Sequence, residues 1–333
     1  MDIQKKRVEK WDILKFILIF LVVLGHYADK YTGFSPMCRG LYIYIYTFHM
    51  PLFLFISGLF SKNNIAKKRY KNIFSFFTLY LLIKIFNMIS KMIVYREFSF
   101  NLFSEGGAPW YALAVFIYSF VTILIKNVSH KYVMIFSIIL AVISGYDNTI
   151  STSFSLARII TYYPFFYLGY CLDPQKVSEF FSKKYYKIIS VIVLLIPAII
   201  VVFKLDSVYW LRPLLTNSVS YASLRDARPF GGLDRLAYYA VAFLMSSAVI
   251  CLTPDKLGNG TVARLGSRSL QVYALHYIVI YLLYGLLNSN SYICKHSWVI
   301  FPLSVATTLL FSLKIFEPFF NTILKPKGLK QND

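Results

Sequence analysis

Two histidines and a lysine lie inside long apolar stretches of this chain, where a side chain that can carry charge is costly. Lys15 and His26 fall in the stretch 12–29, and His49 falls in the stretch 41–61. A charged group at the centre of a bilayer costs at least about 2.5 kcal/mol, so such residues usually face the interior of a helix bundle and serve a function. These three residues are therefore the first candidates for chemistry.

The spacing of Lys15 and His26 places them on one helix face. Eleven residues at 100° each make three turns plus roughly 20°, and separate the two side chains by about 16 Å along the axis. Lys15 alone could snorkel to the lipid headgroups, and His26 alone could be a packed histidine with one hydrogen bond. Their common face favours a shared, inward-facing cavity.

His49 and His26 both lie near the outer ends of their stretches, so the two imidazoles can share a depth. Such a pair can supply a general base and a partner that orients it. It could also begin a metal site, but no carboxylate or third histidine at a matching depth is evident, and we expect no metal. Pro51 permits a kink in this second stretch, and Ser57 with Gly58 offers a small surface for close helix packing.

Further polar residues could support this site. Asp12 precedes Lys15, and Glu105 and Trp110 lie before and at the start of the fourth stretch. Arg158 enters the sixth stretch and is either an interface anchor or a donor to a carbonyl, phosphate or carboxylate. His276 lies about two turns into the ninth stretch, which places it in the inner half of the membrane and away from His26.

The composition requires an apolar environment for much of the chain. Of 333 residues, 57% are apolar and 15% are charged, against about 45–50% and about 25% in soluble domains. Stretches of about 17–25 apolar residues are long enough to span a bilayer. The sequence therefore predicts an all-α, polytopic transmembrane bundle of about ten spans: 12–29, 41–61, 73–94, 110–126, 131–147, 155–172, 187–203, 236–253, 269–287 and 298–316.

The basic residues predict the orientation. Most of the 35 lysines and arginines fall in segments that share one side if the N-terminus is cytoplasmic, and this bias predicts that both termini are cytoplasmic. It also explains the net charge of +20 without nucleic-acid binding, which we exclude. Residues 1–333 form one domain, in which 204–235 is an extracytoplasmic loop, either solvated or acting as a lid for a polar saccharide.

Several motifs resemble the acyltransferase-3 family of integral membrane O-acyltransferases, with the fucose 4-O-acetylase-like subgroup the most similar because it tolerates Lys at position 15. The matches run in the family's order over most of the chain: Asp12-Ile13-Leu14-Lys15 with His26, Phe48-His49-Met50-Pro51-Leu52-Phe53 with Ser57-Gly58, Trp110-Tyr111, Pro164-Phe165-Phe166 with Leu168-Gly169, and Leu265-Gly266 with Ser269-Leu270, Tyr273 and His276.

The resemblance implies transfer of an acyl group, usually acetyl, from acyl-CoA to a sugar hydroxyl of a cell-surface or capsular polysaccharide, or of its lipid-linked precursor. It implies a multi-pass protein of the cell membrane that uses acetyl-CoA as co-substrate, with His26 as the catalytic histidine. His26 would act as general base or as a transient acyl carrier, with His49 beside it. Lys15 and Arg158 would bind the donor or stabilise the oxyanion, and Asp12, Ser57, Glu105, Trp110 and His276 would support the site.

Two other classes of protein stay open at this stage. A transporter or flippase of a polar solute or glycan precursor would also use intramembrane charges and broken helices, although it favours acidic residues within spans, and those are scarce here. A non-catalytic membrane scaffold is the third class. The sequence does not predict the oligomeric state.

Overall fold

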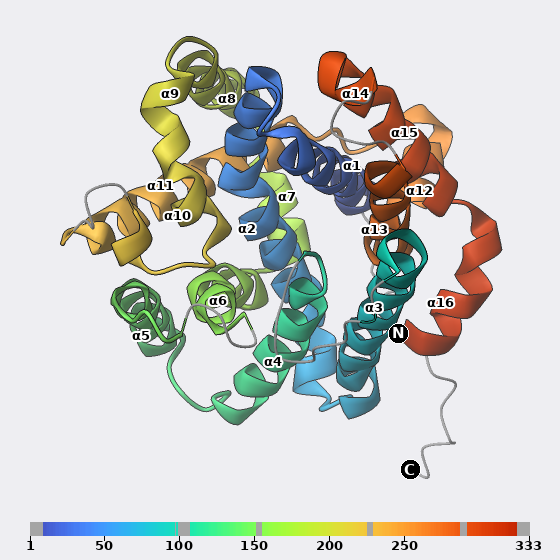
Figure 1. Ribbon diagram of the computed structural model, residues 1–333. Coiled ribbons are helices and arrows are strands. Elements are labelled where there is room, and N and C mark those ends of the chain that lie inside the picture. The colour runs from blue at the N-terminus through green and yellow to red at the C-terminus, as the bar shows by residue number, and fades with distance from the viewer. Residues whose placement is uncertain are drawn as a thin grey trace.

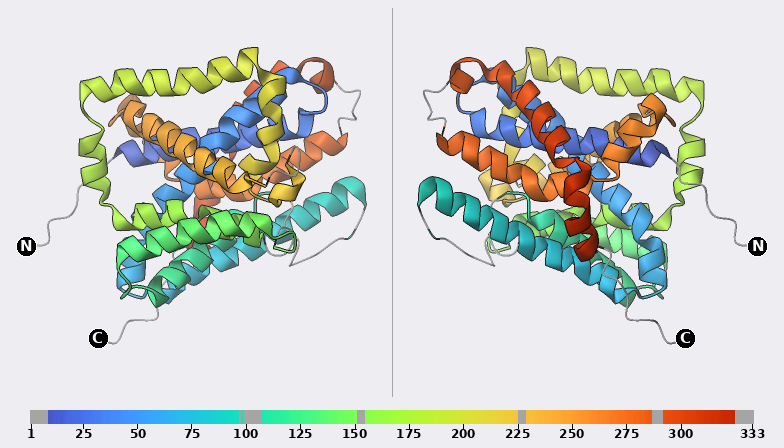
Figure 2. Two further views of the ribbon diagram at one scale, coloured as in Figure 1. Left: turned by 90° about the vertical axis from the view of Figure 1, so that its left-hand side faces the viewer. Right: turned by 90° about the vertical axis from the view of Figure 1, so that its right-hand side faces the viewer.

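The computed structural model describes residues 9–96, 98, 107–150, 155–224, 229–286 and 292–324, and every regular element in these ranges is helical. The predicted all-α membrane bundle is confirmed. Figure 1 looks along the bundle, and Figure 2 shows it from two sides. The helices are α1 (Glu9–Tyr31), α2 (Pro36–Ala66), α3 (Tyr70–Tyr95), α4 (Trp110–Leu124), α5 (His130–Ile143), α6 (Leu156–Cys171), α7 (Pro174–Phe180), α8 (Lys184–Phe203), α9 (Leu205–Val208), α10 (Arg212–Thr216), α11 (Gly231–Leu252), α12 (Thr261–Gly266), α13 (Ser269–Leu286), α14 (Tyr292–Lys295), α15 (Ile300–Phe311) and α16 (Glu317–Leu324).

Each of the ten predicted stretches contains a helix, but not all of these helices are long enough to cross a bilayer alone. Within the described residues, α1, α2, α3, α8 and α11 are long and apolar enough, whereas α4, α5 and α13 are shorter apolar helices. The tenth stretch is broken, because the chain bends by 47° between α15 and α16. The count of ten spans and the cytoplasmic position of the termini therefore stay predictions.

Helix α2 forms the centre of the bundle together with α1. Its start is set by Ser35, whose side chain accepts a hydrogen bond from the backbone N–H of Cys38, and by Pro36 in the first turn. It crosses α6 very closely: a Cβ atom on Gly58 would lie 1.9 Å from the carbonyl oxygen of Phe166, and one on Gly169 would lie 2.0 Å from that of Phe55. Only glycine fits at either position, as at other small-residue crossings in membranes.

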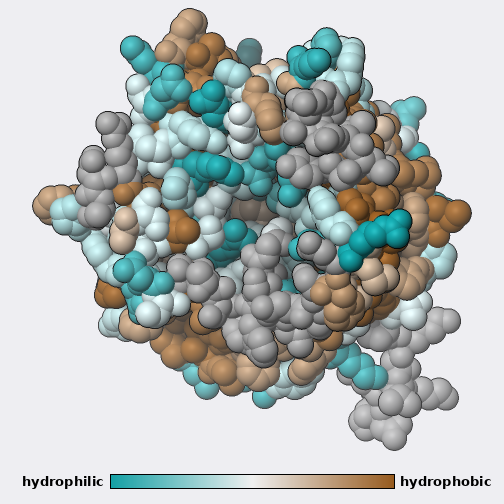
Figure 3. All heavy atoms as spheres, in the orientation of Figure 1, coloured by the Kyte–Doolittle hydropathy of each residue, from teal (hydrophilic) through white to brown (hydrophobic). Residues whose placement is uncertain are grey.

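The perimeter of the bundle is apolar, as lipid contact requires. Helix α8 is almost wholly apolar in sequence, yet Ser190 is its only buried residue. An apolar helix with so little protein around it is stable only when lipid covers it. Hydrophobic residues also dominate the flanks of the molecule in Figure 3.

Four helix ends meet at one end of the bundle, which we call the lysine-rich end. Lys10, near the start of α1, pairs with Asp255 just beyond α11 at 3.5 Å. Lys62 near the end of α2 and Lys176 of α7 line one slot together with Ile250 near the end of α11. The start of α1 and the ends of α2 and α11 are all predicted to lie on the cytoplasmic side, and the structure places them at one end of the bundle. Helix α7, which directly follows α6, lies at the same end.

The predicted loop 204–235 is partly helical and ends in the first turn of α11. Its described part carries α9 and α10 and is tied to the bundle by Arg212, whose guanidinium lies 2.8 Å from the carboxylate of Asp29. Six residues between Arg212 and Val219 line a cavity described below. A lid for a polar saccharide stays a prediction for this loop.

Candidate active site

A polar cavity of about 610 Å³ opens at the end of the bundle opposite the lysine-rich end. Its walls come from α1, α2, α3, α4, α6 and α13, and its cover comes from the segment 212–219. Figure 3 shows a hollow in the face that carries α10, with hydrophilic residues at parts of its rim. We call it the histidine cavity because both His26 and His49 line it.

The backbone holds His49 in a defined tautomer. Its Nδ1 lies 2.7 Å from the carbonyl oxygen of Ile45, one turn back in α2. A carbonyl oxygen only accepts hydrogen bonds, so Nδ1 must carry the proton and Nε2 is left as a proton acceptor. His49 is therefore prepared to act as a general base in the cavity.

His26 is held by two phenol groups that the sequence analysis missed. The hydroxyls of Tyr46 and Tyr277 lie 3.2 Å and 3.0 Å from its Nδ1. A phenol can donate or accept, so this pair accommodates either neutral tautomer and also an N–H of the imidazolium. Tyr46 lies three residues before His49, which is one helical turn, whereas Tyr277 directly follows His276, a spacing that does not place two side chains on one helix face.

The predicted depth of His276 is wrong, because its ring stacks on that of His26 with a centroid separation of 5.3 Å. The prediction assumed that the ninth stretch enters the membrane near Leu265. In the structure, a Cβ atom on Gly266 would lie 1.8 Å from the carbonyl oxygen of Asp12, so this glycine is level with the start of the first stretch. From there, His276 is ten residues along its helix and His26 is 14 residues along α1, and the difference is only about 6 Å of helix axis. His276 is fully buried and is not among the residues that line the cavity, so it faces His26 rather than the open space.

Basic and aromatic side chains form the rest of the cavity. Arg158 donates through Nε to the carbonyl oxygen of Thr216 at 3.1 Å, and its guanidinium lies 5.5 Å from the ring centroid of Trp110. Trp110 in turn stacks on Tyr162 at 5.3 Å. The lining also includes Lys30, Lys91 and Arg212, against Asp29 as its one carboxylate among the described residues. The cavity thus combines aromatic faces with excess positive charge.

Lys15 lies in a second, smaller cavity of about 180 Å³, which we call the lysine cavity. Its ammonium group pairs with the buried carboxylate of Asp12 at 2.8 Å. Ser57 lines the same cavity and shares a hydrogen bond of 2.7 Å with the hydroxyl of Tyr111. The expectation of one cavity shared by Lys15 and His26 is therefore wrong, and Lys15 does not lie beside Arg158.

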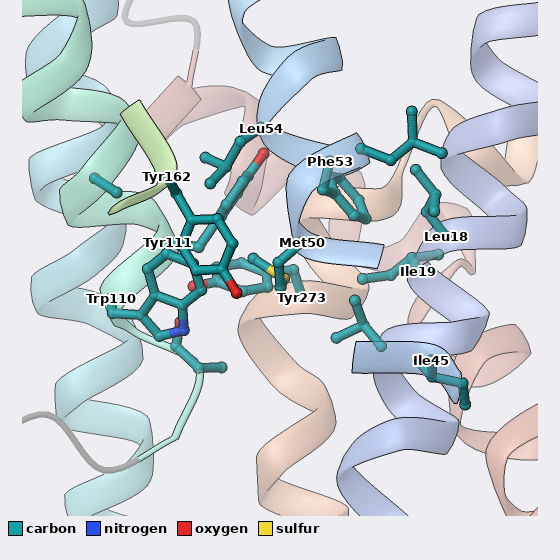
Figure 4. Close-up of a cluster of buried hydrophobic side chains, with 14 of the residues drawn as sticks. Leu18, Ile19, Ile45, Met50, Phe53, Leu54, Trp110, Tyr111, Tyr162 and Tyr273 are labelled. Carbon is teal, nitrogen blue, oxygen red and sulfur yellow. The ribbon is translucent and has the colours of Figure 1, made fainter. Parts of the chain in front are cut away.

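A thin wall separates the two cavities. Met50 lines the histidine cavity and Phe53, one turn further along α2, lines the lysine cavity. Likewise Trp110 faces the first and its neighbour Tyr111 the second. In this wall the ring of Tyr111 lies between those of Phe53 and Tyr273, all three of which are labelled in Figure 4. The centroid of the Tyr111 ring is 5.5 Å from that of Phe53 and 5.0 Å from that of Tyr273. A molecule that reacts at His26 from the lysine cavity must pass this aromatic wall.

Two predictions about site residues are not decided by this geometry. Glu105 lies outside the described residues. Within the part of the chain that the structure describes, no three His, Cys, Asp or Glu side chains gather as a metal site would require, and the absence of a metal cofactor stays a prediction.

Fold and site together define a helical membrane protein with two neighbouring cavities, one of which is lined by His49 with its Nδ1 hydrogen-bonded to the backbone. The chain matches the acyltransferase-3 family, described as an acyltransferase domain, over residues 8–317. It belongs to this family and is an acyltransferase, which removes the transporter and scaffold alternatives. No curated protein and no solved structure matches it. The resemblance to the fucose 4-O-acetylase-like subgroup stays a prediction.

Proposed function

We propose that this acyltransferase moves an acetyl or similar acyl group from acyl-CoA to a sugar hydroxyl of a cell-surface or capsular polysaccharide, or of its lipid-linked precursor. It acts as a multi-pass protein of the cell membrane. The observation that carries the proposal is the hydrogen bond from Nδ1 of His49 to the carbonyl oxygen of Ile45. His49 lines a polar cavity of about 610 Å³. A cavity of this size suits a small polar ligand.

The acceptor enters the histidine cavity and the donor enters from the lysine-rich end. Coenzyme A is a polyanion, so the basic surface at that end attracts it, and the lysine cavity lies on its path. The thioester then has to reach the wall formed by Phe53 and Tyr111 for its carbonyl to approach the histidines. The hydroxyl-bearing and aromatic lining of the histidine cavity provides hydrogen bonds and stacking faces for a sugar.

In the reaction, the sugar hydroxyl oxygen attacks the thioester carbonyl carbon and a new C–O ester bond forms. An imidazole Nε2 takes the hydroxyl proton. The C–S bond breaks, and the imidazolium returns the proton to the leaving thiolate. Arg158 supplies positive charge for the oxyanion, because its guanidinium lies at this cavity. His26 either shares the role of base or carries the acyl group for part of the path.

The activity itself is tested with acetyl-CoA labelled in the acetyl group. Membranes that contain the protein and its host's surface glycan are expected to transfer the label to the glycan, and membranes without the protein are not. Mild alkali should release the label as acetate, because the product is an ester. Equal labelling of the glycan in both membranes would refute the proposal.

Replacing Lys15 by Gln is expected to raise the apparent KM for the acyl donor several-fold with little change in kcat. The reason is that Lys15 lies outside the histidine cavity and would contact only the donor, so its loss removes binding rather than transition-state stabilisation. The measurement is the initial rate at increasing acetyl-CoA concentration. Lys131→Gln, on α5 and away from both cavities, serves as the control; an unchanged KM for Lys15→Gln would contradict the role.

A further inference from the structure

A third hollow, the acyl slot, lies between α2, α6, α7 and α11 and takes no part in the proposed reaction. It has a volume of about 610 Å³ and a lining that is largely aliphatic and aromatic. Its deeper wall includes Pro51, Phe55 and Phe165, which are buried. At its rim, Phe180 and Phe243 are each about half exposed, so the slot is open at the surface of the bundle.

The lining of the slot changes from cationic at its mouth to apolar in its depth, which matches a lipid with an anionic headgroup and apolar acyl chains. Lys62 and Lys176 line its mouth at the lysine-rich end, and both are exposed. Along α2 the lining runs from Lys62 to Pro51, eleven residues or about 16 Å. Half of a bilayer's hydrocarbon core measures about 15 Å. The slot therefore has the length of one leaflet, with cations at headgroup level.

Ser246 of α11 supplies a polar group between these two regions. Its side chain lines the slot and is only 8% exposed, and its hydroxyl has no hydrogen-bond partner in the structure. A buried hydroxyl without a partner is costly, so it indicates a ligand that provides one. Ser246 lies six residues before the end of α11, about 9 Å along the axis, which is deeper than the mouth. An ester carbonyl below a lipid phosphate would meet it there.

We propose that the acyl slot binds one anionic phospholipid of the leaflet at the lysine-rich end. One acyl chain fills the apolar part between α2, α6 and α11, and the phosphate lies between Lys62 and Lys176. The Ser246 hydroxyl donates a hydrogen bond to an ester carbonyl. The mouth has two lysines and one carboxylate, Asp173, a balance that suits a single phosphate rather than the several phosphates of a coenzyme.

The test uses the full-length protein in phosphatidylcholine vesicles that contain a trace of phosphatidylglycerol with a photoactivatable diazirine in one acyl chain. After illumination, mass spectrometry of peptides should place the label on the slot-lining residues of α6 and α11. A diazirine phosphatidylcholine probe should label these residues several-fold less. Lys62→Gln and Lys176→Gln are each expected to lower labelling by phosphatidylglycerol about fivefold, since a lysine near the surface contributes about that factor with anionic lipid.

Three further measurements make the result decisive. Lys183→Gln removes one positive charge from the same end, as each test variant does, without touching the slot, and should leave labelling unchanged. Ser246→Ala keeps the shape of the slot and should lower labelling; Ser246→Phe should abolish it by filling the space. Equal labelling by the two lipids, label confined to α8, or displacement of the probe by acetyl-CoA would overturn the proposal. The readout does not depend on acyl transfer, so its outcome is separate from that of the proposed function.

Discussion

Replacing His26 by Ala is expected to lower the rate of acyl transfer by about 10²- to 10⁴-fold, the usual contribution of a positioned acid–base group. The physical reason is the place of its ring, which lines the histidine cavity and has Nδ1 within reach of the Tyr46 and Tyr277 hydroxyls. The loss should appear in kcat at saturating acetyl-CoA and acceptor. The measurement is transfer of labelled acetyl from acetyl-CoA to the glycan in reconstituted vesicles.

The control for His26→Ala is His296→Ala, since His296 lies beyond α14 and lines neither cavity. Both variants should elute as the wild type does from size-exclusion chromatography. His26→Ala leaves a space beside His276, so His26→Gln, which fills more of it, is the second variant. Near wild-type transfer by either His26 variant would exclude the residue from the reaction.

The sequence could predict which residues of α1 and α2 face inward, because that depends only on local helical geometry. The spacing of Lys15 and His26 predicts one face of α1, and both His26 and His49 line the histidine cavity. The sequence could not predict that Met50 and Phe53 would form a wall between Lys15 and His26. The separation of about 16 Å between those two residues leaves room for such a wall, and its presence depends on how α1 and α4 pack against α2.

His276 shows a second limit of sequence reasoning. Counting residues from the start of an apolar stretch gives depth only if the stretch begins at the membrane surface. The close approach of Gly266 to the backbone of Asp12 sets the level at which α13 begins, and the sequence motif around this glycine does not indicate that contact. Tyr46 and Tyr277 were missed for a different reason: they are two of 27 tyrosines, and only the three-dimensional structure singles out the pair at His26.

The segment 212–219 shows what burial adds to a pattern of charges. In sequence, Arg212 and its neighbours fit a solvated loop as well as a lid. In the structure, the salt bridge between Arg212 and Asp29 and the hydrogen bond from Arg158 to the Thr216 carbonyl hold this segment over the histidine cavity. The acceptor must therefore enter beside this segment or displace it. A large polysaccharide would present one chain end or one residue to the cavity.

Replacing His49 by Ala is also expected to cost about 10²- to 10⁴-fold in kcat, because its Nε2 is the acceptor that the Ile45 carbonyl leaves free. The double variant His26→Ala with His49→Ala distinguishes the possible divisions of labour. If the two histidines act as one unit, the double variant should be no slower than the slower single variant, as in other catalytic units. If they act in separate steps that limit the rate to a similar extent, the fold-reductions in kcat of the two single variants should multiply in the double variant.

Incubation with labelled acetyl-CoA in the absence of acceptor assigns the steps. If His26 carries the acyl group, the wild type and His49→Ala should retain label on the protein after rapid denaturation, and His26→Ala should not. If both histidines act only as bases, none of the three should retain it. His49→Gln is the matched variant of similar volume. Full transfer activity in both His49 variants would show that the tautomer held by Ile45 has no part in catalysis, and the base would then have to be His26.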